Sequence, residues 1–187
     1  MLLHTRNDIL GRALMPKNTV RYVLPCVAAL VTATVLSGQT RPQDRTKSEA
    51  AFKQLASLVG EWEGVQDGVP IQVTYTLTAN GTALMEDQKP GDSPPMITMF
   101  TVDGDHLMAT HYCVTGNQPQ MVSGVPEDLQ KGVTFSLARV TGMKTPADWH
   151  NTGLTVMFDD KDHITQRWTY LYKGKAGSTV FHYARKK

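Results

Sequence analysis

The sequence predicts an all-β protein, an up-and-down antiparallel β-barrel of about eight to ten strands with a short N-terminal helix. After Gly60 the apolar residues recur at every second position, which is the period of a half-buried strand. Turn residues interrupt this pattern about every ten positions. The connections are short, so nothing demands a parallel crossover. A meander of this length must close or leave exposed edges, and closure into a barrel removes the edges. A β-sandwich is the alternative.

Residues 1–39 have the composition of a secretory signal peptide. Three basic residues precede an uncharged apolar run over residues 23–36, and small and polar residues follow from Ser37. The run is about 14 residues long, shorter than the roughly 18 to 20 residues of a membrane-spanning helix. We therefore expect cleavage between Ser37 and Thr40, an exported protein that is periplasmic or secreted, and no permanent membrane anchor. Met15 is an alternative start of translation.

The remaining chain has the size and composition of one globular domain. The full chain has 187 residues, is 41% hydrophobic and carries a net charge of +2. Removal of residues 1–39 takes away four basic residues and one acidic residue, which leaves a charge of about −1. This charge predicts no basic surface for nucleic acid. Cys113 would be the one cysteine left, because Cys26 lies in the apolar run, and we expect Cys113 to be buried or a free thiol.

A short helix is expected to precede the barrel. Residues 40–47 are polar and aperiodic, which indicates a linker, and the barrel domain is assigned to residues 48–187. Apolar residues then recur at intervals of three and four, which predicts a helix over about residues 49–58. Ser48 is the predicted helix cap, and Gly60 ends the helix.

The clearest strand covers residues 71–78, where large apolar side chains occupy every odd position and polar side chains every even one. The Asn80-Gly81 pair then predicts a hairpin turn, because both residue types tolerate a positive φ. The later strands are predicted over residues 82–88, 96–102, 106–114, 120–125, 133–140, 153–158, 163–173 and 179–185.

The segment that opens the first strand resembles the Gly-x-Trp opening of the calycins, the lipocalin and fatty-acid-binding-protein group. It is Leu-Val-Gly-Glu-Trp-Glu-Gly at residues 58–64. In that group a tryptophan at the start of the first strand packs under a basic residue near the end of the last strand. The resemblance implies structural roles for Trp62 and Arg185, because a guanidinium can stack on an indole ring.

Residues 52–187 also resemble uncharacterised, often secreted, bacterial proteins with a lipocalin-like domain of unknown function. The segments that carry this resemblance are GEWEG at 60–64, GDHL at 104–107, THYC at 110–113, GNQP at 116–119 and FDDKDHITQRW at 158–168. The resemblance implies a barrel and no established activity. In that family the loop before the third-last strand tends to end in His-Met-His, and here only His150 corresponds.

The candidate ligand-binding residues follow from strand alternation. His111 and Cys113 share one face of their strand, and Tyr112 lies on the other. In the strand near the C-terminus, Gln166 and Trp168 share the predicted inner face. Polar groups inside an apolar barrel can orient a small ligand. The predicted contacts to a small hydrophobic or amphipathic molecule are His111, Tyr112, Gln118, Gln166 and Trp168.

Other interpretations of these residues stay open. A hydrolase or isomerase could use His111 as acid or base, which needs an open cleft with a carboxylate beside it. A filled barrel could serve as a scaffold or stress protein, which predicts no cavity. Zinc on His111 and Cys113 with His150 or His163, or haem on His111 or His150, is conceivable without a recognised ligand spacing. We favour binding over catalysis, assign no catalytic residue and no cofactor, and expect a monomer or a homodimer.

Overall fold

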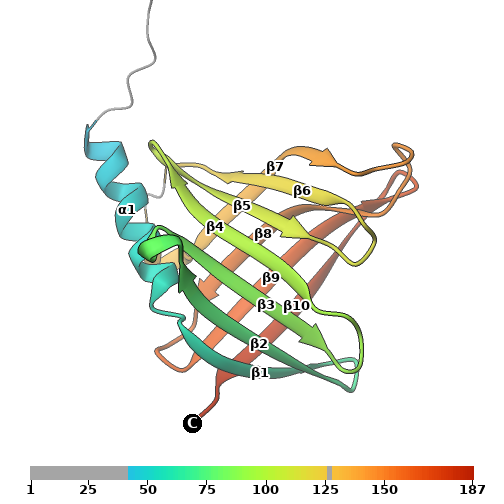
Figure 1. Cartoon of the computed structure of the whole chain (residues 1–187), viewed down its shortest axis with the longest axis horizontal. Helices are drawn as coiled ribbons and strands as arrows, with labels where there is room; N and C mark the ends of the chain where they lie inside the picture. The colour runs from blue at the N-terminus through green and yellow to red at the C-terminus, as the bar shows by residue number, and fades with distance from the viewer. Residues whose placement is uncertain (1–41, 126–127) are drawn as a thin grey trace, which may run out of the picture. The chain divides into compact units, whose positions relative to one another are not determined.

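The computed structural model describes residues 42–125 and 128–187 and shows a closed antiparallel barrel of ten strands with one helix beside it (Figure 1). The strands follow one another around the barrel in chain order, and β1 pairs with β10 to close it. The predicted barrel is confirmed, and the sandwich alternative is wrong. The predicted signal peptide and the alternative start at Met15 lie outside the described residues. In the described ranges no helix combines the length and apolar composition that a membrane crossing requires.

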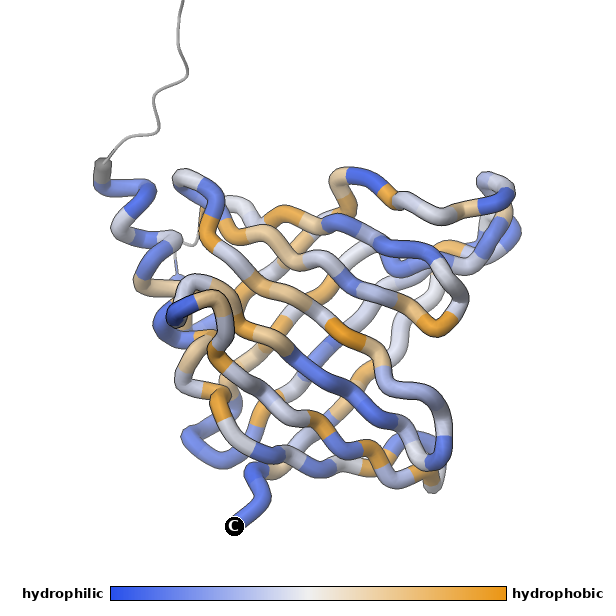
Figure 2. The backbone as a smooth tube through the Cα atoms, in the orientation of Figure 1, coloured by the Kyte–Doolittle hydropathy of each residue, from blue (hydrophilic) through white to orange (hydrophobic). Residues whose placement is uncertain are grey.

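The strand boundaries agree with the predicted ones to within a few residues. The elements are α1 (Pro42–Ala56), β1 (Gly60–Gln66), β2 (Val69–Thr78), β3 (Ala83–Pro90), β4 (Met96–Asp103), β5 (His106–Tyr112), β6 (Gln118–Ser123), β7 (Val133–Thr141), β8 (His150–Phe158), β9 (His163–Tyr172) and β10 (Lys175–Arg185), with short 3₁₀ turns at Ala79–Gly81 and Leu129–Lys131. Apolar and polar residues alternate along β2, as the sequence predicts (Figure 2).

The turn between β9 and β10 is shorter than predicted. Lys173 and Gly174 both have positive φ, of 48° and 74°, as a two-residue hairpin turn of the primed type requires. The strand therefore resumes at Lys175, and β10 is longer than the predicted segment 179–185. Gly177, predicted as a turn residue, lies within β10, where an added Cβ would come 2.4 Å from the Tyr170 side chain.

The helix starts earlier than predicted. It begins at Pro42, a residue type suited to a first helical turn, so residues 42–47 are helical and the linker prediction is wrong for them. An ion pair from Arg45 to Glu49, at 3.1 Å, supports the added turns. Ser48 does not cap the helix, because it lies within it, and its hydroxyl donates to the Gly104 carbonyl at 2.8 Å. The buried apolar side chains that attach this segment to the core are Ala51 and Leu55 on the helix and Leu58 just after it.

Trp62 and Arg185 connect the first and last strands of the barrel. They are register partners on β1 and β10, and the Arg185 guanidinium carbon lies 4.2 Å from the centroid of the Trp62 ring. The same guanidinium donates to the carbonyls of Ser57 and Val59, both at 2.9 Å. The Trp62 indole donates to the Leu58 carbonyl at 2.7 Å. The contact implied by the calycin resemblance is present, and it also fixes the segment between helix and barrel.

The seam between β1 and β10 is short. It contains three residue pairs, the last of which is Gly64 with Tyr183. A Cβ added at Gly64 would lie 2.4 Å from the His182 carbonyl oxygen and 2.9 Å from the Tyr183 ring. Only glycine lets the two strands approach this closely. Beyond this pair β10 continues without β1 as a partner, and the barrel widens on that side (Figure 1).

We predict that Arg185→Ala lowers the free energy of unfolding by about 2 kcal/mol or more, since it removes a stacked cation and charged hydrogen bonds to two carbonyls. Lys186→Ala is the matched control. It removes an exposed ion pair to Glu61, and the expected loss is below about 0.5 kcal/mol. Urea denaturation measures both variants, and equal losses would contradict the assigned role of Arg185.

Candidate ligand-binding site

Three of the predicted contact residues meet in the barrel interior, and two do not. His111 on β5 is 3% exposed, and Gln166 and Trp168 on β9 are buried as well. Tyr112 is 49% exposed, because the alternation that turns His111 inward turns its neighbour outward. Gln118 is bonded on the outer side of the sheet, where its amide accepts from Thr141 at 2.9 Å and donates to the Gly116 carbonyl at 3.0 Å.

A buried carboxylate, Glu86 on β3, lies at the centre of the interior. It accepts hydrogen bonds from the Tyr75 hydroxyl at 2.6 Å, from the Gln166 amide, and from the Thr98 hydroxyl at 3.3 Å. Burial raises the pKa of Glu86, and the three donors act in the opposite direction. Sequence reasoning missed Glu86, although it shares a strand face with Leu84 and the alternation could have placed it inside.

A hydroxyl connects this carboxylate to His111. The Thr98 Oγ1 atom lies 3.0 Å from His111 Nδ1. The Trp168 ring lies beside the imidazole, with 4.8 Å between ring centroids, and its indole donates to Gln166 Oε1 at 2.9 Å. Burial lowers the pKa of His111 to about 4. The imidazole is therefore neutral at pH 7.

A cavity of about 80 Å³ lies in the inner wall next to His111. Its inner end is formed by buried polar or aromatic side chains, and its outer end by half-buried residues that open toward solvent. The lining residues are Gln88, Met96, His111, Trp149, Asn151, Trp168, Tyr170, Thr179 and Phe181. Polar groups thus lie at the base and apolar surface at the rim, as ligand-binding cavities commonly show.

The segment from Thr110 to Met121 contributes to this site in two ways. It supplies His111, and it holds the rim through Asn117, whose amide donates to the Trp149 carbonyl at 2.6 Å. Within residues 42–125 and 128–187, the Oδ1 atom of Asn117 is the buried side-chain oxygen without a hydrogen-bond partner. Cys113 is a buried free cysteine, and burial is one of the two states expected for it.

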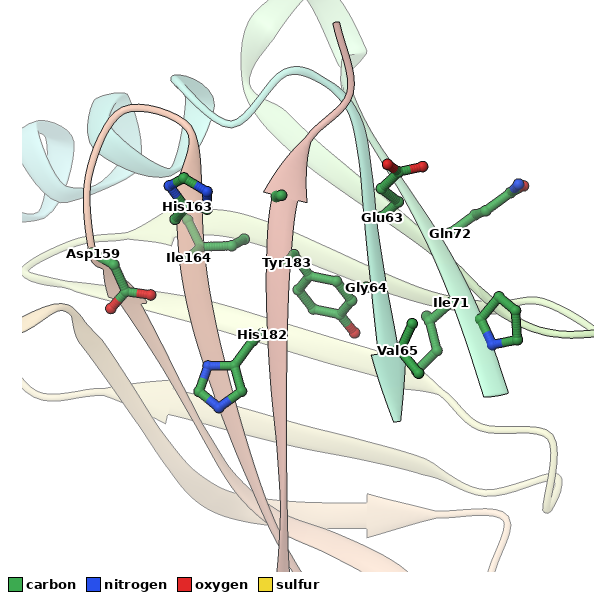
Figure 3. A pocket seen from close by; sticks show the side chains of 12 residues that line it. Glu63, Gly64, Val65, Ile71, Gln72, Asp159, His163, Ile164, His182 and Tyr183 are labelled. Atoms are coloured by element: carbon green, nitrogen blue, oxygen red, sulfur yellow. The ribbon is translucent and has the colours of Figure 1, made fainter. Parts of the chain in front are cut away.

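A larger hollow of about 610 Å³ lies on the other side of the wall, across the β1–β10 seam. Figure 3 shows Glu63 and Gln72 on one side of it and Asp159, His163 and His182 on the other. These polar side chains are exposed, unlike the inner site. Size alone does not make it the better candidate, because the residues predicted to bind a ligand do not line it.

The surroundings of His111 bear on the two metal-containing groups considered from the sequence. Across the described ranges no three His, Cys, Asp or Glu side chains gather as metal ligands would. His150 Nδ1 donates to the Asp148 carbonyl at 2.9 Å, and His150 lines a different hollow from His111. The cavity beside His111 has about 80 Å³, whereas a single benzene ring already occupies an engineered cavity of about 150 Å³. It therefore does not enclose a porphyrin.

Comparisons with known proteins support the fold and add no activity. No family model matches the sequence, and no curated protein matches it. The structure is similar to that of Rv2717c from M. tuberculosis, with 15% identity, a TM-score of 0.50, and coverage of 73% of this chain and 98% of that one. A protein of unknown function from the DUF3598 family of Nostoc punctiforme shows 15% identity, a TM-score of 0.41, and coverage of 71% of this chain and 49% of that one. This chain thus spans about half the length of the second protein. At this identity the likeness to Rv2717c shows a shared fold alone.

We predict that acid destabilises the protein through His111. The folded-state pKa is about 4 against 6.5 for the free side chain, so the unfolded chain binds an extra proton between these values. Stability is therefore lost as the pH falls from 6.5 toward 4, by up to about 3 kcal/mol. The raised pKa of Glu86 acts in the opposite sense and is common to the wild type and His111→Gln. Denaturation of both proteins between pH 7 and pH 4 should show a steeper loss in the wild type, and parallel curves would contradict the prediction.

We predict that Glu86→Gln lowers the free energy of unfolding by about 2 kcal/mol, because an amide NH₂ would face donors where a carboxylate oxygen now accepts. Glu63→Gln on the exposed face of β1 is the control and should change stability by less than about 0.5 kcal/mol. Thermal and urea unfolding at pH 7 provide the measurement. A loss no greater than that of the control would show that the carboxylate is not required.

Proposed function

We propose that the protein binds a small, partly apolar ligand without covalent chemistry, with one end of the ligand in the cavity beside His111. The observation that carries this proposal is the placement of buried polar side chains at the base of a cavity whose rim is aromatic and apolar. In such a site the polar groups fix the orientation of the ligand, and the rim removes its apolar surface from water.

The size of the cavity limits what enters it. A volume of about 80 Å³ corresponds to two or three water molecules at roughly 30 Å³ each. Only the head of a ligand fits there, and the remainder would lie among Met96, Trp149 and Phe181 at the rim. Methionine has a flexible, polarizable side chain, so Met96 can adapt to ligands of different shape.

The contacts of His111 favour binding over acid–base catalysis. The imidazole reaches Glu86 only through the Thr98 hydroxyl, so no carboxylate orients the ring directly. A general base works best with a pKa near the operating pH, and burial lowers the pKa of His111 to about 4. The hydrolase or isomerase interpretation therefore has less support than a binding role.

A filled barrel that acts as a scaffold is the second candidate, and the small cavity volume favours it. Large side chains and the Glu86 network occupy most of the interior. The scaffold interpretation predicts that no ligand accompanies the protein. Export to the periplasm or the medium is part of the proposal, and its support is the composition of residues 1–39. A nucleic-acid partner is not proposed.

The test is native mass spectrometry of the protein purified gently from its own host. We expect an added mass that disappears on denaturation and is reduced by His111→Ala. Tyr112→Ala is the matched control, because Tyr112 is the next residue on the strand and faces outward. Circular dichroism checks that both variants are folded. A bare protein mass in the wild type, with no binding from host extracts, would contradict the proposal and favour the scaffold.

A further inference from the structure

Three side chains present unused hydrogen-bonding groups to the cavity beside His111. Asn151 is 4% exposed and lines the cavity, and its amide has no hydrogen-bond partner within the described ranges. Gln88 uses its Nε2 atom to donate to the Tyr183 hydroxyl at 2.7 Å, which leaves Oε1 available. His111 is bonded at Nδ1 alone, which leaves Nε2. Among the described residues Asn117 Oδ1 is the fully buried side-chain atom without a partner, so the free atoms of these three side chains are reached through the cavity and are available to a ligand there.

The network below the cavity determines which nitrogen of His111 carries the proton. In its ionised form the Glu86 carboxylate only accepts, and the Tyr75 hydroxyl, the Gln166 amide and the Thr98 hydroxyl all donate to it. The single proton of the Thr98 hydroxyl is then committed to Glu86. Nδ1 of His111 must donate to the Thr98 oxygen, and Nε2 retains its lone pair. The histidine therefore offers an acceptor to the cavity.

The electrostatics of the cavity select against charged head groups. The lining contains no Lys or Arg side chain, so a carboxylate would lie without a cation beside it and above the buried Glu86. A cation would lose its hydration without a lining anion, since Glu86 is already bonded by three donors and does not line the cavity. Burial of an unpaired charge is far more costly than burial of a hydrogen-bonded neutral group.

The rim indicates a flat ring next to the polar head. The Trp149 and Tyr170 rings lie 5.5 Å apart at their centroids, and Phe181 on β10 lines the same cavity. Gly177 permits this arrangement, because an added Cβ would collide with the Tyr170 ring. Aromatic side chains stack favourably on planar ligands in offset or tilted geometry.

We propose that the ligand is a neutral aromatic molecule with a phenolic hydroxyl at its buried end. The hydroxyl donates to Nε2 of His111 and accepts from the Asn151 amide, and the ring lies among Trp149, Tyr170 and Phe181. This inference rests on the proposed binding function and names the chemical class of its ligand.

The test is calorimetric titration of the whole protein with four para-substituted toluenes of similar size. They are p-cresol, 4-methylanisole, p-toluate and 4-methylbenzylamine, which carry a neutral donor, a blocked oxygen, an anion and a cation. We expect p-cresol to bind at least about tenfold more tightly than the other three, which corresponds to about 1.4 kcal/mol. Asn151→Leu should reduce the affinity for p-cresol, because the phenol oxygen accepts from the Asn151 amide. Tyr112→Phe, on the outer face, should leave this affinity unchanged.

The outcomes separate this inference from the binding function. Equal affinities for p-cresol and 4-methylanisole, or tighter binding of the anion or the cation, would overturn the phenol assignment and leave a binding role intact. No binding of any probe, together with an added mass from the host, would also overturn the ligand class alone. No binding of any probe and a bare mass from the host would overturn both.

Discussion

The requirement that a buried carboxylate be hydrogen-bonded organises the interior of this barrel. Glu86 on β3 is bonded by side chains from β2, β4 and β9, which lie on different sides of the wall. An unpaired charge at this depth would cost several kcal/mol, so these strands must keep the register that brings the donors together. The same bonds set the position of Gln166, through it the Trp168 indole, and through Thr98 the orientation of His111. The cavity lies above this fixed base.

Local alternation accounts for much of what could be predicted. It separates His111 and Cys113 from Tyr112 on opposite faces of one strand without saying which face is inner, and it assigns Gln166 and Trp168 to one inner face. These are properties of single strands, in which the pleat alternates at every residue whatever the neighbouring strand is. The barrel itself followed from the number of short strands and the need to cover their edges. The pairing of Trp62 with Arg185 came from resemblance, because no local pattern relates residues so far apart.

The rest depends on which residues lie opposite one another across the interior. Asn151 and Gln88 face the cavity only because β8 and β3 contribute to the same end of the barrel, and the sequence pattern of either strand does not contain that relation. Glu86 shows the same limit, since an acidic residue in a strand is ordinarily assigned to the wet face. Residues 174–177 were predicted to form one turn because they begin and end with glycine, although Gly177 lies inside β10 and provides space for Tyr170. The helix began early because its first turns are supported by an ion pair rather than by apolar periodicity.

The short seam of three pairs between β1 and β10 has a consequence for how the barrel forms and opens. It joins the two ends of the domain, so its closure carries the largest loss of chain entropy of any strand pairing, while few backbone hydrogen bonds compensate. The seam is accordingly expected to close last in folding and to open first in local unfolding, with amide hydrogens of β1 exchanging ahead of those in β3 and β9. Such an opening would separate β1 from β10 while β1 stays paired with β2 and the Glu86 network stays assembled, so the wall can open locally without loss of the interior.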